Sequence, residues 1–124
     1  MSFEVDDTGP VFRVRYFDTV DDEVVAESLE AILATPGFRH KDQLVDYTDV
    51  TSYRVTLDGL RRLPGRLQAH IEQHGPRDQR NAYVVPEDIE YGMGRVFLAR
   101  IDADERSELF RTIAEASAWL GLPE

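Results

Sequence analysis

Near the start of the chain, hydrophobic and polar residues alternate with the two-residue period of a strand. Phe12, Val14 and Tyr16 share one face of the segment 11–17, and two arginines alternate with them on the other face. This pattern predicts a half-buried strand. The preceding segment Ser2–Val5, followed by the turn-forming string Asp-Thr-Gly-Pro, predicts a short antiparallel edge strand in a hairpin.

Further along, hydrophobic residues recur every three or four positions, which is typical of helices with one buried face. A first helix is predicted with Thr19 as its N-cap and an end at Pro36. A second helix is predicted over Thr56–His74. A kink or a restart is expected inside it at Pro64, because proline has no backbone N–H to donate.

Two more helices are predicted toward the C-terminus. The third begins at Pro86, which suits the first turn of a helix because its missing donor costs nothing there. The last helix is predicted to be capped by Thr112 and stopped by Gly121. The inner face of the third helix would be made by Ile89, Met93, Val96, Phe97 and Arg100.

Three short strands are predicted between these helices, at Gln43–Tyr47, Arg80–Val85 and Glu105–Phe110, and residues 48–55 are expected to form a loop. Strands that alternate with helices predict an α/β fold. We expect a mostly parallel central sheet of about five strands, with an antiparallel edge strand and four helices packed around it. The 124 residues are enough for one hydrophobic core, so a single domain over residues 1–124 is expected.

Charge and composition narrow the classes of partner. The 14 basic residues against 24 acidic ones give a net charge of -10, which repels phosphate backbones, so no nucleic-acid binding is expected. The chain has no cysteine, no secretory signal and no apolar run long enough to cross a bilayer, so we expect a cytoplasmic location and no membrane insertion. A local basic face would need the arginines that lie close in sequence, which are Arg61, Arg62, Arg66, Arg77 and Arg80.

The order of elements resembles that of a known family. The C-terminal third contains the strings AYVVPEDIEYGMGRVFLARI and ELFRTIAEASAWLGL. These strings are similar to the SpoIIAA-like branch of the STAS family, the sulfate-transporter and anti-sigma-factor-antagonist domains. The resemblance covers nearly the whole chain in element order and implies the same fold. The wider superfamily implies either regulation through a protein partner or the carriage of lipid.

The resemblance also implies a regulatory residue. In the anti-sigma-factor antagonists, a phosphorylated Ser or Thr lies after the central strand, at the start of the next helix, in a D-S-S-G-like string. The matching segment here is Asp46–Gly59, in which the D-S pair is missing and the glycine arrives only at its end. Thr56 falls nearest the switch position, and Thr51 and Ser52 are weaker candidates. A hydroxyl there is also an ordinary helix N-cap, so both interpretations stay open.

A second candidate site lies in the predicted third helix. Tyr91 and Arg95 are four residues apart, so they share a helix face that would line a ligand pocket or an interface. Gly92 and Gly94 beside them allow another chain or element to approach closely. A homodimer through this helix is therefore one prediction.

No residue pattern identifies an active site. His70 and His74 share a helix face, but no third ligand accompanies them, so neither a metal site nor a cofactor is predicted. The leading hypothesis is a non-enzymatic regulatory or protein-interaction domain with a protein partner. The alternative is a carrier of a small apolar ligand or lipid, and an enzyme is the weakest hypothesis. The aromatic residues available for an apolar cleft are Tyr16, Tyr47, Tyr53 and Tyr83.

Overall fold

The computed structural model describes residues 2–35, 41–74, 80–85 and 107–122. The elements in these ranges are β1 (Phe3–Asp6), β2 (Phe12–Asp21), α1 (Asp22–Ala34), β3 (Gln43–Arg54), α2 (Leu57–His74), β4 (Asn81–Val84), β5 (Ser107–Phe110) and α4 (Ile113–Leu120). The predicted third helix lies outside the described residues, and the predicted number of four helices is therefore not confirmed. Helix α1 ends at Ala34 with Thr35 as its C-cap, directly before the predicted stop at Pro36, which itself lies outside them.

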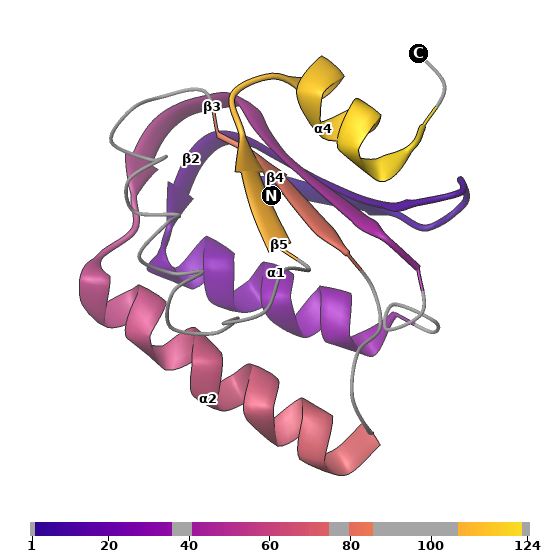
Figure 1. Ribbon diagram of the computed structural model, residues 1–124. Helices are drawn as coiled ribbons and strands as arrows, with labels where there is room; N and C mark the ends of the chain where they lie inside the picture. Colours follow the sequence, from indigo (N-terminus) through magenta and orange to yellow (C-terminus); the bar gives the residue numbers. More distant parts are fainter. Residues whose placement is uncertain (1, 36–40, 75–79, 86–106, 123–124) are drawn as a thin grey trace.

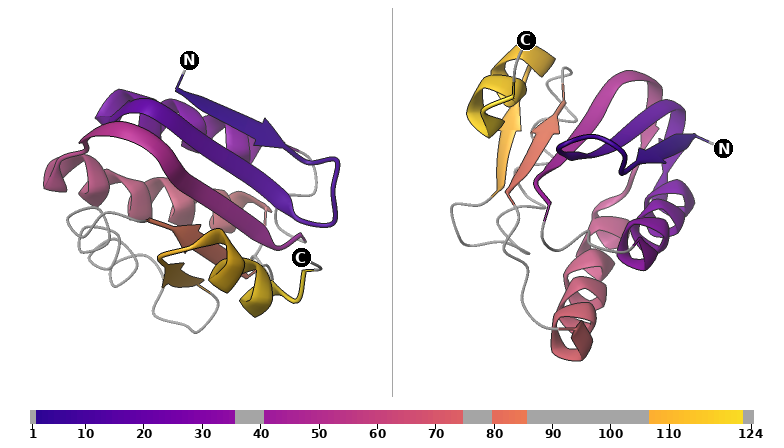
Figure 2. Two further views of the ribbon diagram at one scale, coloured as in Figure 1. Left: turned by 90° about the horizontal axis from the view of Figure 1, so that it is seen from above. Right: turned by 90° about the vertical axis from the view of Figure 1, so that its right-hand side faces the viewer.

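The strands form one sheet in the order β1-β2-β3-β4-β5. The edge strand β1 runs antiparallel to β2, and every other neighbouring pair is parallel. Helices α1 and α2 lie on one side of the sheet, and α4 lies on the other (Figures 1 and 2). The predicted α/β fold, with its mostly parallel sheet and antiparallel edge, is confirmed.

Two hydrophobic clusters hold the helices to the sheet. Adjacent residues of a strand point to opposite faces, so Leu44 and Val45 of β3 contribute to different clusters. Val45 belongs to the cluster on the α1 side, with Ile32 and Leu33. Leu44 belongs to the cluster under α4, where Ala116 is fully buried. Every described helix falls short of the length and apolarity needed to cross a membrane.

Strands β2 and β3 are longer than predicted. Both continue past the sheet proper and pair with each other alone, with Val20 opposite Tyr53 and Asp21 opposite Arg54. The predicted loop over residues 48–55 is therefore wrong, because burial of Val20 and parallel pairing outweigh the polar, turn-like local sequence. The predicted cap at Thr19 is also wrong. Thr19 lies in β2, and the Asp21 carboxylate instead accepts the N–H of Val24 at 2.9 Å.

Other predicted helix ends are confirmed. The Thr112 hydroxyl accepts the N–H of Glu115 at 3.2 Å, which makes it the N-cap of α4. Gly121 ends the same helix in the left-handed conformation, with φ of 73°. The restart that was one of the two alternatives at Pro64 is wrong, because helix α2 continues through Pro64 as a single helix.

Candidate functional site at the start of helix α2

Thr56 connects the end of β3 to the start of α2 and is exposed. Its Oγ1 accepts the backbone N–H of Gly59 at 3.0 Å, so it is the N-cap that the sequence predicts. The cap satisfies one of the N–H groups that have no partner inside a helix at its first turn.

The same hydroxyl also donates to a residue of another helix. Asp22 is the first residue of α1, and its Oδ2 accepts the Thr56 hydroxyl at 2.6 Å. Its Oδ1 accepts the backbone N–H of Thr56 at 2.8 Å. One carboxylate therefore joins the start of α1 to the start of α2, and we call Asp22, Thr56 and Gly59 the helix latch.

Gly59 makes room for this carboxylate. A Cβ atom placed on Gly59 would lie 2.2 Å from Oδ1 of Asp22, far inside van der Waals contact. Any side chain at this position would displace the carboxylate from Thr56. The family pattern D-S-S-G places its glycine directly after the serines, whereas here the glycine follows Thr56 only at position 59. A glycine is needed at this later position because the Asp22 carboxylate lies where a side chain would be.

The latch keeps Asp22 charged. Hydrogen bonds from the Thr56 hydroxyl and N–H lower the pKa of Asp22 below its usual 3.8, and the nearby Arg62 lowers it further. A lowered pKa means that the carboxylate stabilises the fold above its ordinary pKa and loses this effect as pH falls through the lowered value. The negative charge of Asp22 is also favourable at the N-termini of α1 and α2, where the helix dipoles are positive. The carboxylate already occupies the position that an external anion would take at the start of α2.

A second polar contact ties the two helices further along. The guanidinium of Arg66 in α2 donates to both carboxylate oxygens of Glu30 in α1, at 2.6 and 2.8 Å. The pKa of Arg66 is raised by this partner. Because both contacts join corresponding turns, α1 and α2 lie side by side in the same direction (Figure 1).

The two weaker switch candidates lie outside the latch. Thr51 and Ser52 belong to β3 rather than to a loop. The Thr51 hydroxyl donates to the carbonyl of Asp18 at 3.2 Å, and Ser52 Oγ accepts Nε of Arg54 at 3.3 Å. Asp18 itself has a positive φ of 58° next to a register shift in β2. The structure therefore brings neither hydroxyl to the start of α2.

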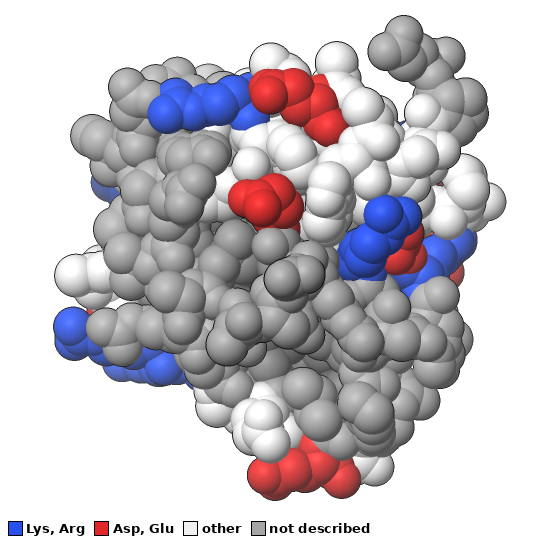
Figure 3. All heavy atoms as spheres, in the orientation of Figure 1, with Lys and Arg blue, Asp and Glu red and all other residues white. Residues whose placement is uncertain are grey.

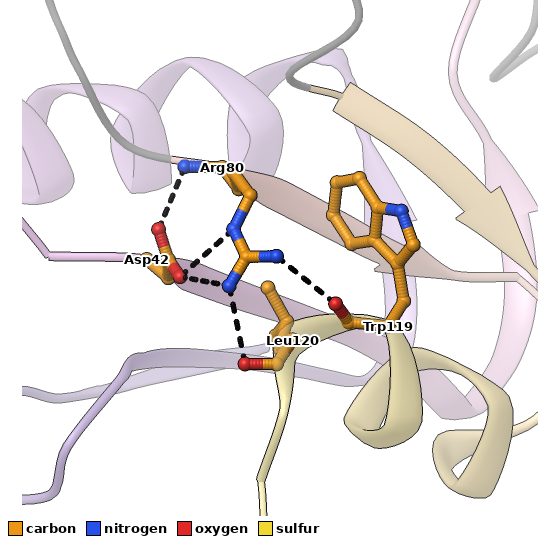
Figure 4. A network of polar contacts seen from close by, with 4 residues as sticks. All are labelled: Asp42, Arg80, Trp119 and Leu120. Atoms are coloured by element: carbon orange, nitrogen blue, oxygen red, sulfur yellow. Dashed lines mark hydrogen bonds and ion pairs between the residues drawn. The ribbon is translucent and has the colours of Figure 1, made fainter.

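A different polar network fixes α4 at the opposite end of the strands (Figure 4). Arg80, just before β4, donates to Asp42 through Nε and Nη2, at 3.1 and 2.8 Å, and through its backbone N–H at 2.9 Å. The same guanidinium donates to the last carbonyls of α4, those of Trp119 and Leu120, at 3.0 and 3.2 Å. These carbonyls have no partner within the helix, so Arg80 acts as a cap from outside it.

The four tyrosines that the sequence offers for lining an apolar cleft instead pack in or against the hydrophobic cluster on the α1 side. Tyr16 is 4% exposed, and its hydroxyl lies 2.5 Å from Oγ of the buried Ser28. Its ring stacks on Tyr47 with centroids 4.6 Å apart, and Tyr47 meets Tyr53 edge-on at 6.4 Å. Burial raises the pKa of both Tyr16 and Tyr47. Tyr83 is partly buried against the same cluster.

The remaining candidates are not tested by the geometry. Tyr91, Gly92, Gly94 and Arg95 lie outside the described residues, and so does the predicted dimer surface that they would form. The side chains of His70 and His74 also lie outside the description. Among the side chains that the structure does describe, Asp and Glu form no cluster that would hold a metal ion.

The sequence missed Asp22 as a site residue. In the sequence it reads as one of several acids in the first turn of a helix, and its partner Thr56 is 34 residues away. The sequence feature that could have indicated this role is the pair of consecutive acids at the start of the helix, Asp21 and Asp22. The first caps its own helix, and the second is left to bond elsewhere.

Comparison with known proteins supports the fold. No family model and no curated protein matches the chain. Among solved structures, the chain is similar to an uncharacterised protein of the DUF3478 family from Shewanella loihica PV-4, whose crystal structure has a SpoIIAA-like fold. The similarity covers 95% of this chain and 91% of that one, with 17% sequence identity and a TM-score of 0.52. The chain therefore has the SpoIIAA-like fold that its sequence resembles.

Proposed function

We propose that the chain is a non-enzymatic regulatory domain that acts by binding another protein, and that the Thr56 hydroxyl controls this binding. One observation carries the proposal. The exposed hydroxyl of Thr56 is both the cap of α2 and the donor to Asp22 of α1. A change at one accessible oxygen atom therefore acts on two helices at once.

Phosphorylation would change this atom in a defined way. The modified oxygen has no proton to donate to Asp22, and the phosphate adds roughly two negative charges beside the carboxylate. Repulsion between the two groups favours a different arrangement of the α2 start, whose surface a partner would then read differently. Thr51 and Ser52 support the proposal less, because neither hydroxyl joins two helices.

The alternatives have less support from the geometry. A carrier of a small apolar ligand needs a cavity, whereas Tyr16 and Tyr47 stack on each other in the core. An enzyme needs ionisable groups that converge in a cleft. The strongest described pKa shifts belong to these same two core tyrosines, and burial is their first cause. The fold itself is shared by proteins of many functions and does not choose among them.

The test compares variants of one residue. Thr56→Ser keeps a hydroxyl, Thr56→Val removes it, and Thr56→Glu adds a negative charge. Each variant would be expressed in the cells that make the protein, cross-linked and analysed for bound proteins, while intact mass and peptide mapping locate any phosphate. We expect phosphate on Thr56, and a partner that the Ser variant captures and the Glu variant loses. Equal capture by all variants, with Thr56 unmodified under every growth condition, would contradict the proposal.

A further inference from the structure

The contacts between α1 and α2 define which side of α2 faces α1. A Cβ atom added to Gly59 would meet the Asp22 carboxylate, and Arg66 binds Glu30. Gly59 and Arg66 are seven residues apart and therefore share one face of the helix. The residue three positions after the first and four before the second lies on the same face. That residue is Arg62, which is exposed.

The facing side of α1 has a matching spacing. The carboxylates that hold α2, those of Asp22 and Glu30, are eight positions apart, and the exposed Ala26 lies midway between them. Because the two helices run in the same direction (Figure 1), Arg62 lies opposite Ala26 and between the two acids. The middle of this contact therefore contains a guanidinium with no acid directly opposite.

Electrostatics also place Arg62 beside the latch. The hydrogen bonds from Thr56 are the main cause of the lowered pKa of Asp22, and the charge of Arg62 acts in the same direction. Its sequence neighbour Arg61 instead meets Asp58 of its own helix, at 3.3 Å. In Figure 3, basic side chains gather at the lower left, over the first half of α2, on a chain with a net charge of -10. Of the two adjacent arginines, Arg62 is the one that faces the latch.

A phosphate on Thr56 would compete with Asp22 for one position. In a kinase, the phosphoryl group leaves a nucleoside triphosphate, its bond to the diphosphate breaks, its bond to Oγ1 forms, and the hydroxyl proton passes to the kinase. The phosphate oxygens then lie two bonds from Oγ1, about as far away as Oδ2 of Asp22 lies now, at 2.6 Å. Because the phosphate adds roughly two negative charges, it repels the carboxylate from this position. The charge of Arg62 already acts there.

We propose that Arg62 binds the phosphate of a phosphorylated Thr56, and that this phosphate replaces the Asp22 carboxylate at the start of α2. The inference rests on the proposed function and names the residue through which the modification acts. A guanidinium binds phosphate through two parallel hydrogen bonds, which are stronger than neutral ones. Asp22 then loses its contact with α2, whereas the contact of Arg66 with Glu30 lies further along the helices and remains.

The test uses a chain that carries phosphothreonine at position 56, introduced during translation, so the result does not depend on a cellular kinase. Phosphorus NMR over a series of pH values measures the second pKa of the phosphate, which is about 6 without a partner and falls beside a cation. We expect Arg62→Gln to raise this pKa by about 0.5 or more, because the dianion loses its partner. Arg62→Lys keeps the charge and should restore part of the difference.

Arg61→Gln is the matched control. Arg61 is the adjacent residue of the same helix and is also exposed, so its substitution removes the same charge, but its guanidinium meets Asp58. This variant should change the pKa of the phosphate by about 0.2 or less, because exposed charges that do not face each other are screened by salt. Circular dichroism and thermal unfolding show that each variant is folded before the pKa values are compared.

Equal pKa values of the phosphate in the Arg61→Gln and Arg62→Gln chains would overturn the inference, because the phosphate would then lie in solvent, away from Arg62. The experiment also separates the inference from the proposed function. If Arg62 binds the phosphate but Thr56 is never phosphorylated in cells, the proposed control by Thr56 is wrong. If phosphate on Thr56 changes partner capture but its pKa does not respond to Arg62, only the role of Arg62 is wrong.

Discussion

The docking of α4 on the sheet and the junction between the starts of α1 and α2 are held by different means, although α1 also packs its own hydrophobic cluster against the sheet. On one side, α4 packs Ala116 and Leu120 against Leu44 and neighbouring strand residues, and Arg80 binds its last carbonyls. On the other side, the starts of α1 and α2 meet through the exposed latch. Buried apolar contacts stabilise strongly, whereas exposed polar contacts contribute little. A domain with a well-packed core can therefore contain one contact between helices that needs little free energy to break. Here that contact is the latch, which contains Thr56.

The largest effect is expected on the α4 side. Leu120→Ala leaves a cavity under a helix whose leucine is 6% exposed, so the free energy of unfolding should fall by about 2–5 kcal/mol. Urea unfolding measures this change. Ala118→Gln, at an exposed position of the same helix, is the control and should stay within about 0.5 kcal/mol. A loss below 1 kcal/mol for Leu120→Ala would mean that α4 is not firmly docked.

A smaller effect is expected from Thr56→Val on the opposite side. The variant keeps the shape of threonine but removes both the cap and the donor to Asp22. We expect the free energy of unfolding to fall by about 1 kcal/mol, since the site is exposed. Thr56→Ser should restore most of it. A loss as large as that of Leu120→Ala would remove the contrast between the two junctions.

The smallest net effect is expected from Gly59→Ala. Alanine favours the helix by about 1 kcal/mol over glycine, but its Cβ pushes Asp22 away from Thr56, so the two effects nearly cancel. Gly65→Ala is the matched control, because no atom lies within 4 Å of the added Cβ and only the helix preference remains. Unfolding curves should therefore show Gly65→Ala as the more stable variant. Equal gains from both would show that the latch contributes nothing.

The elements that depend on local sequence were predictable. Alternation marked the face of β2 that holds Phe12 and Val14, and single residues marked the starts and ends of helices at Thr56, Thr112 and Gly121. These signals act over two to four residues, which is the range over which side-chain patterns and caps operate.

The elements that depend on distant partners were not predictable. Residues 48–54 are polar and turn-like by themselves, and they form a strand only because residues 17–21 pair with them. Asp22 and Gly59 have roles only relative to each other and to Thr56, across more than thirty residues of sequence. The sequence therefore located the hydroxyl of the candidate site but not the carboxylate that gives it two roles.

Amide hydrogen exchange of the unaltered chain, followed residue by residue by NMR, tests the central claim most directly. Exchange reports the free energy of local opening, which differs between firmly packed and loosely held elements. We predict that the amides of Arg61 and Arg62 open with a clearly lower free energy than those of Ala116 and Leu120 in α4. Equal protection at the start of α2 and in α4 would contradict the account, because the latch would then open only when the whole domain unfolds.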